Sequence, residues 1–353
     1  MLTRRSVIEG AFGLCVYEAA ERCSIAAPTL TPPASAIPRG ACDSHVHVIG
    51  DLKRFPMDPH RDYTPAPATA DDLQKVLEFL RLDRVVIVTP VAYGSDNSAT
   101  VAAIEQLGRE RARGIAWVNS AMRPETLNRI KEAGVIGVRL FLSTGNSIDR
   151  PAAARRLQKA IDLAEPWGWH LQISTSPEVI DALQDQLAAA PVPIVLDYFG
   201  WVAGGVGQRG FDAIVSLLAA GHIYVKLSEP YRLSKKPPDY IDLVSVVHAY
   251  VAANPDRLLW GSGWPHVSGG IPGRPKSEIS PNLAVDTGHQ LNLLADWIPN
   301  PETRRKILVD NPAALYGFTR IKSPRSRCGP FVRGTPNELV PTTAASSTLP
   351  PPY

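Results

Sequence analysis

Cysteine is scarce in this chain: its 353 residues include four cysteines, and no two of them have Cys-x-x-Cys spacing. They stand at Cys15, Cys23, Cys42 and Cys328. Cysteines scattered in this way form neither a disulfide framework nor a zinc knuckle, so small folds held together by disulfides or by zinc are excluded. We interpret the four thiols as reduced or incidental.

The chain also lacks an excess of charge of either sign. Its 37 basic and 34 acidic residues leave a formal net charge of +3, and no lysine or arginine cluster is interleaved with aromatic residues. These features argue against nucleic acid and anionic membranes as partners. No apolar run approaches the length of about 18 residues that a membrane span needs. We therefore expect a small-molecule partner, and the sequence predicts no oligomeric state.

The N-terminus has a twin arginine, Arg4-Arg5, ahead of a mildly apolar run that reaches Ala27. This arrangement resembles a bacterial twin-arginine export signal, which would make the protein periplasmic. Charged residues interrupt the apolar run at Glu9, Glu18, Glu21 and Arg22. A disordered leader on a cytoplasmic protein is therefore the favoured alternative. Residues 28–40 are rich in proline, alanine and serine and read as a linker, so 1–40 is leader and linker.

From residue 41 to residue 318, short β-branched runs alternate with segments of helical spacing. The first run is 41–50, and the others are 85–88, 115–118, 136–142, 170–174, 194–196, 223–227 and 258–260. The helical segments are 71–81, 96–112, 124–132, 152–165, 177–188, 210–220 and 239–252. Eight alternating strands predict an α/β fold, a single (β/α)8 TIM barrel, which typically needs about 250 residues. The tail from 319 to 353 is expected to be disordered.

The first strand carries Asp43, His45 and His47 on alternate positions, so all three side chains point the same way. In a barrel of this kind the active site lies at the carboxyl ends of the strands. His45, His47 and the strand residue His170 are therefore candidates to polarise a substrate oxygen or to bind a metal. His266 follows the last strand and is a further candidate.

Seven segments carry a resemblance to a known family. They are CDSHVHVIGD at 42–51, YTPAPAT at 63–69, VTPVAYGSDN at 88–97, GVRLF at 137–141, KLSEPYRLS at 226–234, WGSGWPH at 260–266 and DNPAALYGF at 310–318. In this order they resemble the amidohydrolase superfamily, and within it the branch that includes 2-pyrone-4,6-dicarboxylate hydrolase and related lactone hydrolases. The resemblance implies a barrel hydrolase for a lactone or similar cyclic ester, metal-dependent or metal-free, with an aspartate of the eighth strand activating water.

Several residues depart from that family pattern. The resemblance implies the aspartate at position 263, where this chain has Gly263, and a histidine and an arginine where it has Tyr198 and Trp201. Losing a general base typically costs about 10²–10⁴ in rate. Glu229 stands at a strand exit where the family commonly has glycine. Our hypothesis is that Glu229 partly replaces the lost aspartate, with Tyr198 as a hydrogen-bond donor to the substrate carbonyl.

A substrate-anchoring set remains. Arg139 and Arg232 match family positions that bind a substrate carboxylate, a task that suits the guanidinium fork. Tyr63 matches a family tyrosine that donates to the same ligand, and His266 completes the set. A second arginine expected after Arg139 is Gly145 here. A smaller or less charged acid is therefore favoured over a dicarboxylate pyrone.

Three functions remain open at this stage. The first is a hydrolase of a carboxylated lactone or related cyclic ester, and the second is a barrel that has lost catalysis and still binds a small acid. The third is a lyase or decarboxylase of the amidohydrolase type. We predict no cofactor, with one zinc or manganese ion at His45, His47 and His170 as the alternative, since three nitrogens can hold zinc with water as fourth ligand.

Overall fold

A computed structural model of the protein describes residues 30–142, 149–270 and 273–319. The predicted twin-arginine leader and the tail from residue 320 lie outside these described residues, as does Gly145. Within the described ranges, no helix is both long enough and apolar enough to cross a lipid bilayer.

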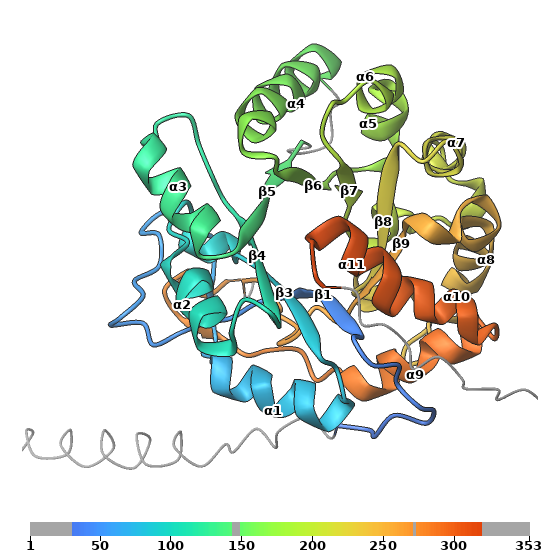
Figure 1. Ribbon diagram of the computed structural model, residues 1–353, viewed down its shortest axis with the longest axis horizontal. Helices are drawn as coiled ribbons and strands as arrows, with labels where there is room; N and C mark the ends of the chain where they lie inside the picture. The colour runs from blue at the N-terminus through green and yellow to red at the C-terminus, as the bar shows by residue number, and fades with distance from the viewer. Residues whose placement is uncertain (1–29, 143–148, 271–272, 320–353) are drawn as a thin grey trace, which may run out of the picture. The chain divides into compact units, whose positions relative to one another are not determined.

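Eight parallel strands form one sheet that curls into a barrel (Figure 1). They are β1 (Cys42–Val46), β3 (Arg84–Val88), β4 (Ala112–Ala116), β5 (Val135–Phe141), β6 (His170–Ser174), β7 (Ile194–Leu196), β8 (Ile223–Ser228) and β9 (Leu258–Gly261). Each strand pairs with the next one in this order, which confirms the predicted TIM barrel. A separate pair, β2 (Thr64–Pro65) and β10 (Ile279–Ser280), forms a small second sheet.

The ends of the sheet meet just beyond β1 and β9. The backbone N–H of Gly263 donates to the carbonyl of His45 at 2.8 Å, and the N–H of His47 donates to the carbonyl of Trp264 at 2.7 Å. These two bonds hold the segment that leaves β9 against the histidine pair of β1. The carboxyl end of the last strand is therefore part of the same site as the first.

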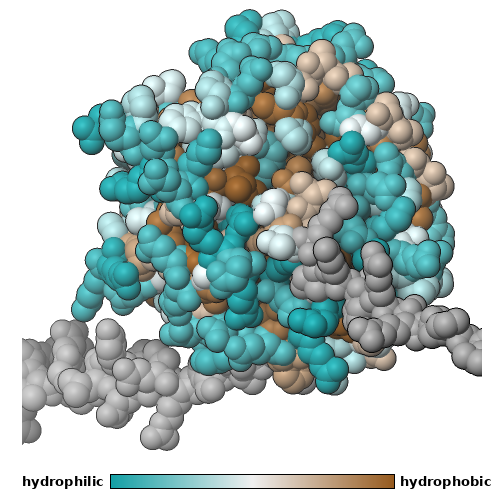
Figure 2. All heavy atoms as spheres, in the orientation of Figure 1, coloured by the Kyte–Doolittle hydropathy of each residue, from teal (hydrophilic) through white to brown (hydrophobic). Residues whose placement is uncertain are grey.

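Helices surround the strands (Figure 1). They are α1 (Ala70–Leu80), α2 (Ser98–Leu107), α3 (Pro124–Glu132), α4 (Arg150–Ala164), α5 (Pro177–Ala182), α6 (Gln184–Ala188), α7 (Phe211–Ala219), α8 (Val244–Ala253), α9 (Thr287–Trp297), α10 (Pro301–Arg305) and α11 (Asn311–Tyr316). In α1, Thr69 and Asp72 form a capping box, and Leu73, Leu77 and Leu80 are buried at helical spacing. Figure 2 shows the result: hydrophilic residues along the outer rim and hydrophobic residues nearer the barrel.

The last helix within the described residues, α11, covers the amino end of the barrel. Its Tyr316 and the following Phe318 share one buried cluster with Cys42, Val86 and Leu259 of the barrel strands. In Figure 1, α11 crosses in front of the strands. This end is filled by side chains, so the chemistry belongs to the opposite, carboxyl end.

Some predicted boundaries were wrong. Strand β4 begins at Ala112, three residues before the predicted run 115–118, and α2 stops at Leu107 because Gly108 follows with a φ of +87°. The predicted helix 177–188 is two helices, since Leu183 between them leaves helical geometry with a φ of −113°.

Residues 30–40, which the sequence predicted to be a linker, form a strap that starts along α9 and leads to β1. The N–H of Thr31 donates to Asp286 at 3.0 Å, and the N–H of Ala34 donates to Asn292 at 2.8 Å. A Cβ atom on Gly288 would lie 1.8 Å from the carbonyl oxygen of Thr31. Only glycine permits this approach, so the first turn of α9 is shaped to receive the strap.

Candidate active site

Two neutral imidazoles lie at the carboxyl end of β1. The rings of His45 and His47 are 5.2 Å apart between centroids, with their planes at 88°. Nδ1 of His47 lies 2.7 Å from the carbonyl of Val88. A carbonyl only accepts, so Nδ1 carries the proton and Nε2 keeps its lone pair. Burial lowers the pKa of His45 and holds the pKa of His47 well below its usual value, so both are uncharged at neutral pH.

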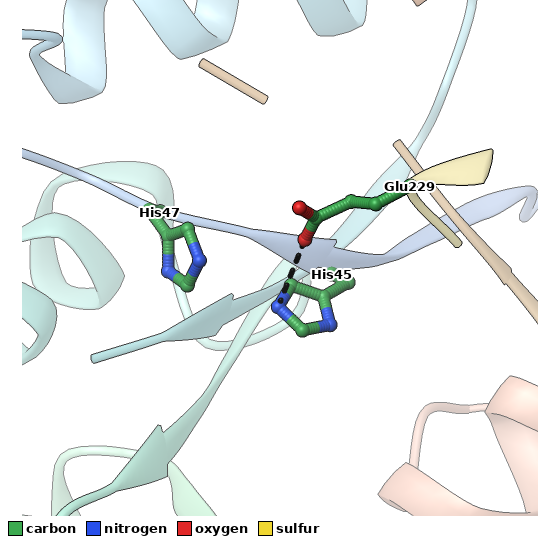
Figure 3. A group of neighbouring side chains, drawn as sticks. All are labelled: His45, His47 and Glu229. Atoms are coloured by element: carbon green, nitrogen blue, oxygen red, sulfur yellow. Dashed lines mark ion pairs between the residues drawn. The ribbon is translucent and has the colours of Figure 1, made fainter. Parts of the chain in front are cut away.

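His45 lies between two carboxylates. Its Nδ1 is 3.2 Å from Asp197 Oδ1. Its Nε2 is 3.6 Å from Glu229 Oε1, as the dashed line in Figure 3 marks. All three side chains are 0 % exposed. The contact with Asp197 favours the proton on Nδ1. Nε2 and Glu229 Oε1 then face each other as two acceptors, and a proton or a cation between them would satisfy both.

Glu229 follows β8 directly and adopts a left-handed conformation with φ 51° and ψ 53°. That conformation costs a non-glycine residue about 1–2 kcal/mol. Its Oε2 accepts hydrogen bonds from the Tyr231 hydroxyl at 2.8 Å and from Arg232 Nε. Its Oε1 finds no hydrogen-bond partner among the described residues. One oxygen is therefore anchored while the other is free and faces His45.

Asp197, directly after β7, is the centre of a buried charge network. Lys226 Nζ lies 3.7 Å from its Oδ1, Arg139 Nη2 lies 3.9 Å from its Oδ2, and Gln172 donates to Oδ2 at 3.0 Å. Lys226 also donates to Gln172 at 2.6 Å. Although burial alone would raise it, the contacts with His45, Lys226 and Arg139 hold the pKa of Asp197 well below its usual range. Asp197 is thus an anion that orients His45.

Arg139 of β5 and Tyr198 meet beside this network. Arg139 Nη2 donates to the Tyr198 hydroxyl at 2.7 Å, and the Tyr198 ring lies 5.3 Å from that of His45. The guanidinium also lies over Phe141, which stacks on Trp117. Its Nε has no hydrogen-bond partner within the part of the chain that the structure describes. A buried cation with a free donor is suited to an anionic ligand.

The other predicted binding residues lie around Glu229. Arg232 is about a quarter exposed, and its Nη2 donates to the carbonyl of Val267 at 3.3 Å. Tyr63 lies within electrostatic range of both Arg139 and Arg232. His266 is buried and bonds Thr287 Oγ1 through Nε2 at 2.8 Å, so it supports the site from α9 and does not point freely into it.

Comparison with known proteins agrees with this geometry. The amidohydrolase family model matches residues 42–318. The chain belongs to the amidohydrolase family. It is 36 % identical to a 4-sulfomuconolactone hydrolase of Rhizobium radiobacter, over 81 % of this chain and 93 % of that protein. It is 33 % identical to a 2-pyrone-4,6-dicarboxylate hydrolase of Comamonas testosteroni, over 80 % of this chain and 92 % of that protein.

A solved structure shares the barrel of this amidohydrolase. It is a probable 2-pyrone-4,6-dicarboxylic acid hydrolase from Acinetobacter baumannii with citric acid bound. The two chains are 25 % identical with a TM-score of 0.62, over 79 % of this chain and 100 % of that one. The architecture predicted from strand alternation is therefore that of the family.

Among the residues that the structure describes, one group of side chains in this amidohydrolase fits a metal ion. His45, His47 and Glu229 each offer one ligand atom, and these atoms lie within 4.8 Å of one another. The second ring nitrogen of each histidine faces an oxygen, of Asp197 or of Val88, which is the usual support of metal-bound histidine. Two nitrogens and one carboxylate oxygen suit zinc or manganese.

His170 does not belong to that group, so the expected three-histidine site is not formed. It is the first residue of β6, at the amino end of the barrel, where its ring lies 5.5 Å from that of Tyr316 in α11. Burial lowers its pKa to about 3. Its distance from the cluster follows from its place at the start of the strand, while catalytic groups gather where strands end.

Three further residues of the amidohydrolase site were missed from sequence. Lys226 and Gln172 face the barrel interior and hold Asp197, and Tyr231 holds Glu229. The signal for Lys226 was a charge within the apolar run 223–227. A lysine is almost never fully buried without a partner, so a buried carboxylate beside it could have been expected. Tyr231 had no comparable signal.

Proposed function

We propose that this amidohydrolase hydrolyses a lactone or related cyclic ester that carries an acid group, a carboxylate or a sulfonate. The observation that carries the proposal is the buried combination of the His45, His47 and Glu229 cluster with two arginines beside it. Relatives named as hydrolases of 4-sulfomuconolactone and of 2-pyrone-4,6-dicarboxylate support the same bond and the same kind of substrate.

The acid group of the substrate would bind between Arg139 and Arg232. The free Nε of Arg139 supports this role, as does the position of Tyr63 within range of both cations. Arg139 Nη2 already donates to the Tyr198 hydroxyl, so only the remaining N–H groups of the guanidinium can bind the substrate. This arrangement favours a ligand with a single acid group at this point.

Hydrolysis then needs a water molecule to lose a proton as its oxygen bonds to the lactone carbonyl carbon. Glu229 Oε1 would take that proton and return it to the ring oxygen as the ring C–O bond breaks, which gives the open-chain hydroxy acid. Tyr198 would donate to the carbonyl oxygen, since burial raises the pKa of its hydroxyl and keeps it protonated. Asp197 would hold His45 in place.

We propose zinc or manganese at His45, His47 and Glu229 as the cofactor. Glu229 Oε1 would hold the ion through one lone pair and keep its other lone pair for the proton of water. A divalent ion bound there would lower the pKa of water and polarise the carbonyl. The chain itself contributes neutral imidazoles with their lone pairs available and a carboxylate with one free oxygen.

A pH-indicator assay tests the function. Lactones with a carboxylate, with a sulfonate and with no acid group are offered to protein treated with a chelator and then given zinc or manganese. We expect turnover of the acid-bearing lactones and little of the neutral one. Ligand-dependent stabilisation without turnover would instead support a barrel that only binds its ligand. Silence in both measurements would reject the proposed substrate class.

A further inference from the structure

Glu229 and Gly263 lie at the exits of neighbouring strands, β8 and β9, and share one volume. A Cβ atom on Gly263 would lie 2.1 Å from Glu229 Cγ and 2.5 Å from Glu229 Cδ. It would also lie 2.8 Å from the Tyr231 hydroxyl. The Glu229 side chain therefore fills the space that a side chain at position 263 would enter, and a side chain added there would force one of the two to shift.

Both residues have a positive φ, 51° for Glu229 and 79° for Gly263. Glycine is the residue that such a backbone favours, so position 229 is the unusual one of the two. A fully buried glutamate is retained there in spite of the backbone strain. Strain of this kind concentrates where a side chain has a task in the site.

The carboxylate is held so that one oxygen stays available. Tyr231 and Arg232 both bond Oε2, whereas Oε1 faces His45 Nε2 at 3.6 Å and has no hydrogen bond within the described residues. Gly263 is itself bonded to the His45 carbonyl through its N–H. A side chain from either position would therefore reach the same region beside His45.

We propose that Glu229 supplies the carboxylate of this active site from β8, and that it can do so because position 263, after β9, is glycine. The two positions act as a single steric unit that admits one carboxylate. This inference rests on the proposed function, because it gives Glu229 the task of taking the proton from water and returning it to the ring oxygen. It also makes a claim about packing that does not depend on turnover.

Four proteins test whether side chains at positions 229 and 263 exclude each other. They are the natural chain, Glu229→Gly, Gly263→Asp and the double variant. We expect Gly263→Asp alone to lower Tm by about 2–5 °C through the collision, and the double variant to recover most of that loss. Gly168→Asp is the matched control, because Gly168 also has a positive φ, +66°, and a Cβ there would meet nothing within 4 Å. A Gly263→Asp protein no less stable than this control would overturn the steric unit.

Activity tests the chemical half of the inference. Glu229→Gly is expected to lower kcat/KM by about 10²–10⁴-fold, and the double variant to regain at least tenfold over it. Unchanged turnover in Glu229→Gly would overturn the catalytic assignment. If no lactone is turned over by any of the four, the proposed function has failed, while the Tm cycle still decides whether the two positions exclude each other.

Discussion

Asp197 Oδ1 lies 3.2 Å from Nδ1 of His45, and neither side chain is exposed. The carboxylate holds the imidazole so that Nε2 faces Glu229. We expect Asp197→Asn to lower kcat by about 10–100-fold, the usual effect of losing such a support. KM for an acid-bearing lactone should change little, since both arginines remain. Steady-state kinetics with circular dichroism as a folding control would measure this, and an unchanged kcat would contradict it.

Lys226 is the buried cation nearest to Asp197 Oδ1 in this network, at 3.7 Å. Its replacement by methionine leaves the carboxylate with less compensation, and breaking a buried ion pair typically costs about 3–5 kcal/mol. Urea unfolding at pH 7 would measure the loss. Lys75→Met is the control, because Lys75 pairs with Asp72 at the surface and such pairs contribute little. Equal, small changes in both variants would refute the network.

Arg139 is predicted to bind the acid group of the substrate. A hydrogen bond to a charged group contributes about 1.5–3 kcal/mol, so Arg139→Met should raise KM for an acid-bearing lactone by about 10–100-fold. KM for a neutral lactone should stay the same. Arg113→Met serves as the comparison, since Arg113 packs over Phe318, a residue of the cluster at the amino end. A rise in KM for both lactones would speak against anion binding.

His170 should affect stability and its pH dependence, with no effect on the chemistry. Burial lowers its pKa from 6.5 to about 3 in the folded protein. Between these pH values the unfolded chain binds a proton that the folded protein does not, so stability falls as the pH drops from 6.5 towards 3. The slope is about 1.4 kcal/mol per pH unit. Urea unfolding of His170→Gln between pH 7.5 and 4.5 should show a shallower decline.

The same variant should keep its turnover at pH 7.5. Loss of activity in a folded His170→Gln protein would place His170 in the active site. A pH slope equal to that of the natural chain would contradict the lowered pKa of His170.

Metal content distinguishes a site that contains Glu229 from one that contains His170, each together with His45 and His47. We expect elemental analysis to find one equivalent of zinc or manganese in the purified protein. His47→Ala and Glu229→Gln should lower that content, whereas His170→Gln should leave it unchanged. Metal lost from His170→Gln and kept in Glu229→Gln would favour the three-histidine site.

The fold was predictable because each β/α unit carries its own local pattern. The predicted strands 170–174 and 194–196 match β6 and β7 residue for residue. The run 115–118 was placed too late because Ala112 and Arg113, which begin β4, do not read as strand residues. Local pattern thus identified the strands, while pairing with a neighbour decided where each one began.

The site was predictable in part. His45, His47 and Glu229 come together as the strand exits suggested. The sequence analysis placed His170 among them although it is the first residue of its strand. The direction of the chain was enough to place it at the amino end of the barrel, away from the site. Lys226 and the shared volume of positions 229 and 263 needed the assembled barrel, because they depend on which side chains meet across strands.

The strap formed by residues 30–40 also imposes an order of events during synthesis. Thr31 is made 255 residues before its partner Asp286. At about 5–20 residues per second, roughly 13–50 s pass between the two. Throughout that interval residues 30–34 lack the helix that they bond in the folded protein, so the strap is among the last parts of the barrel to dock.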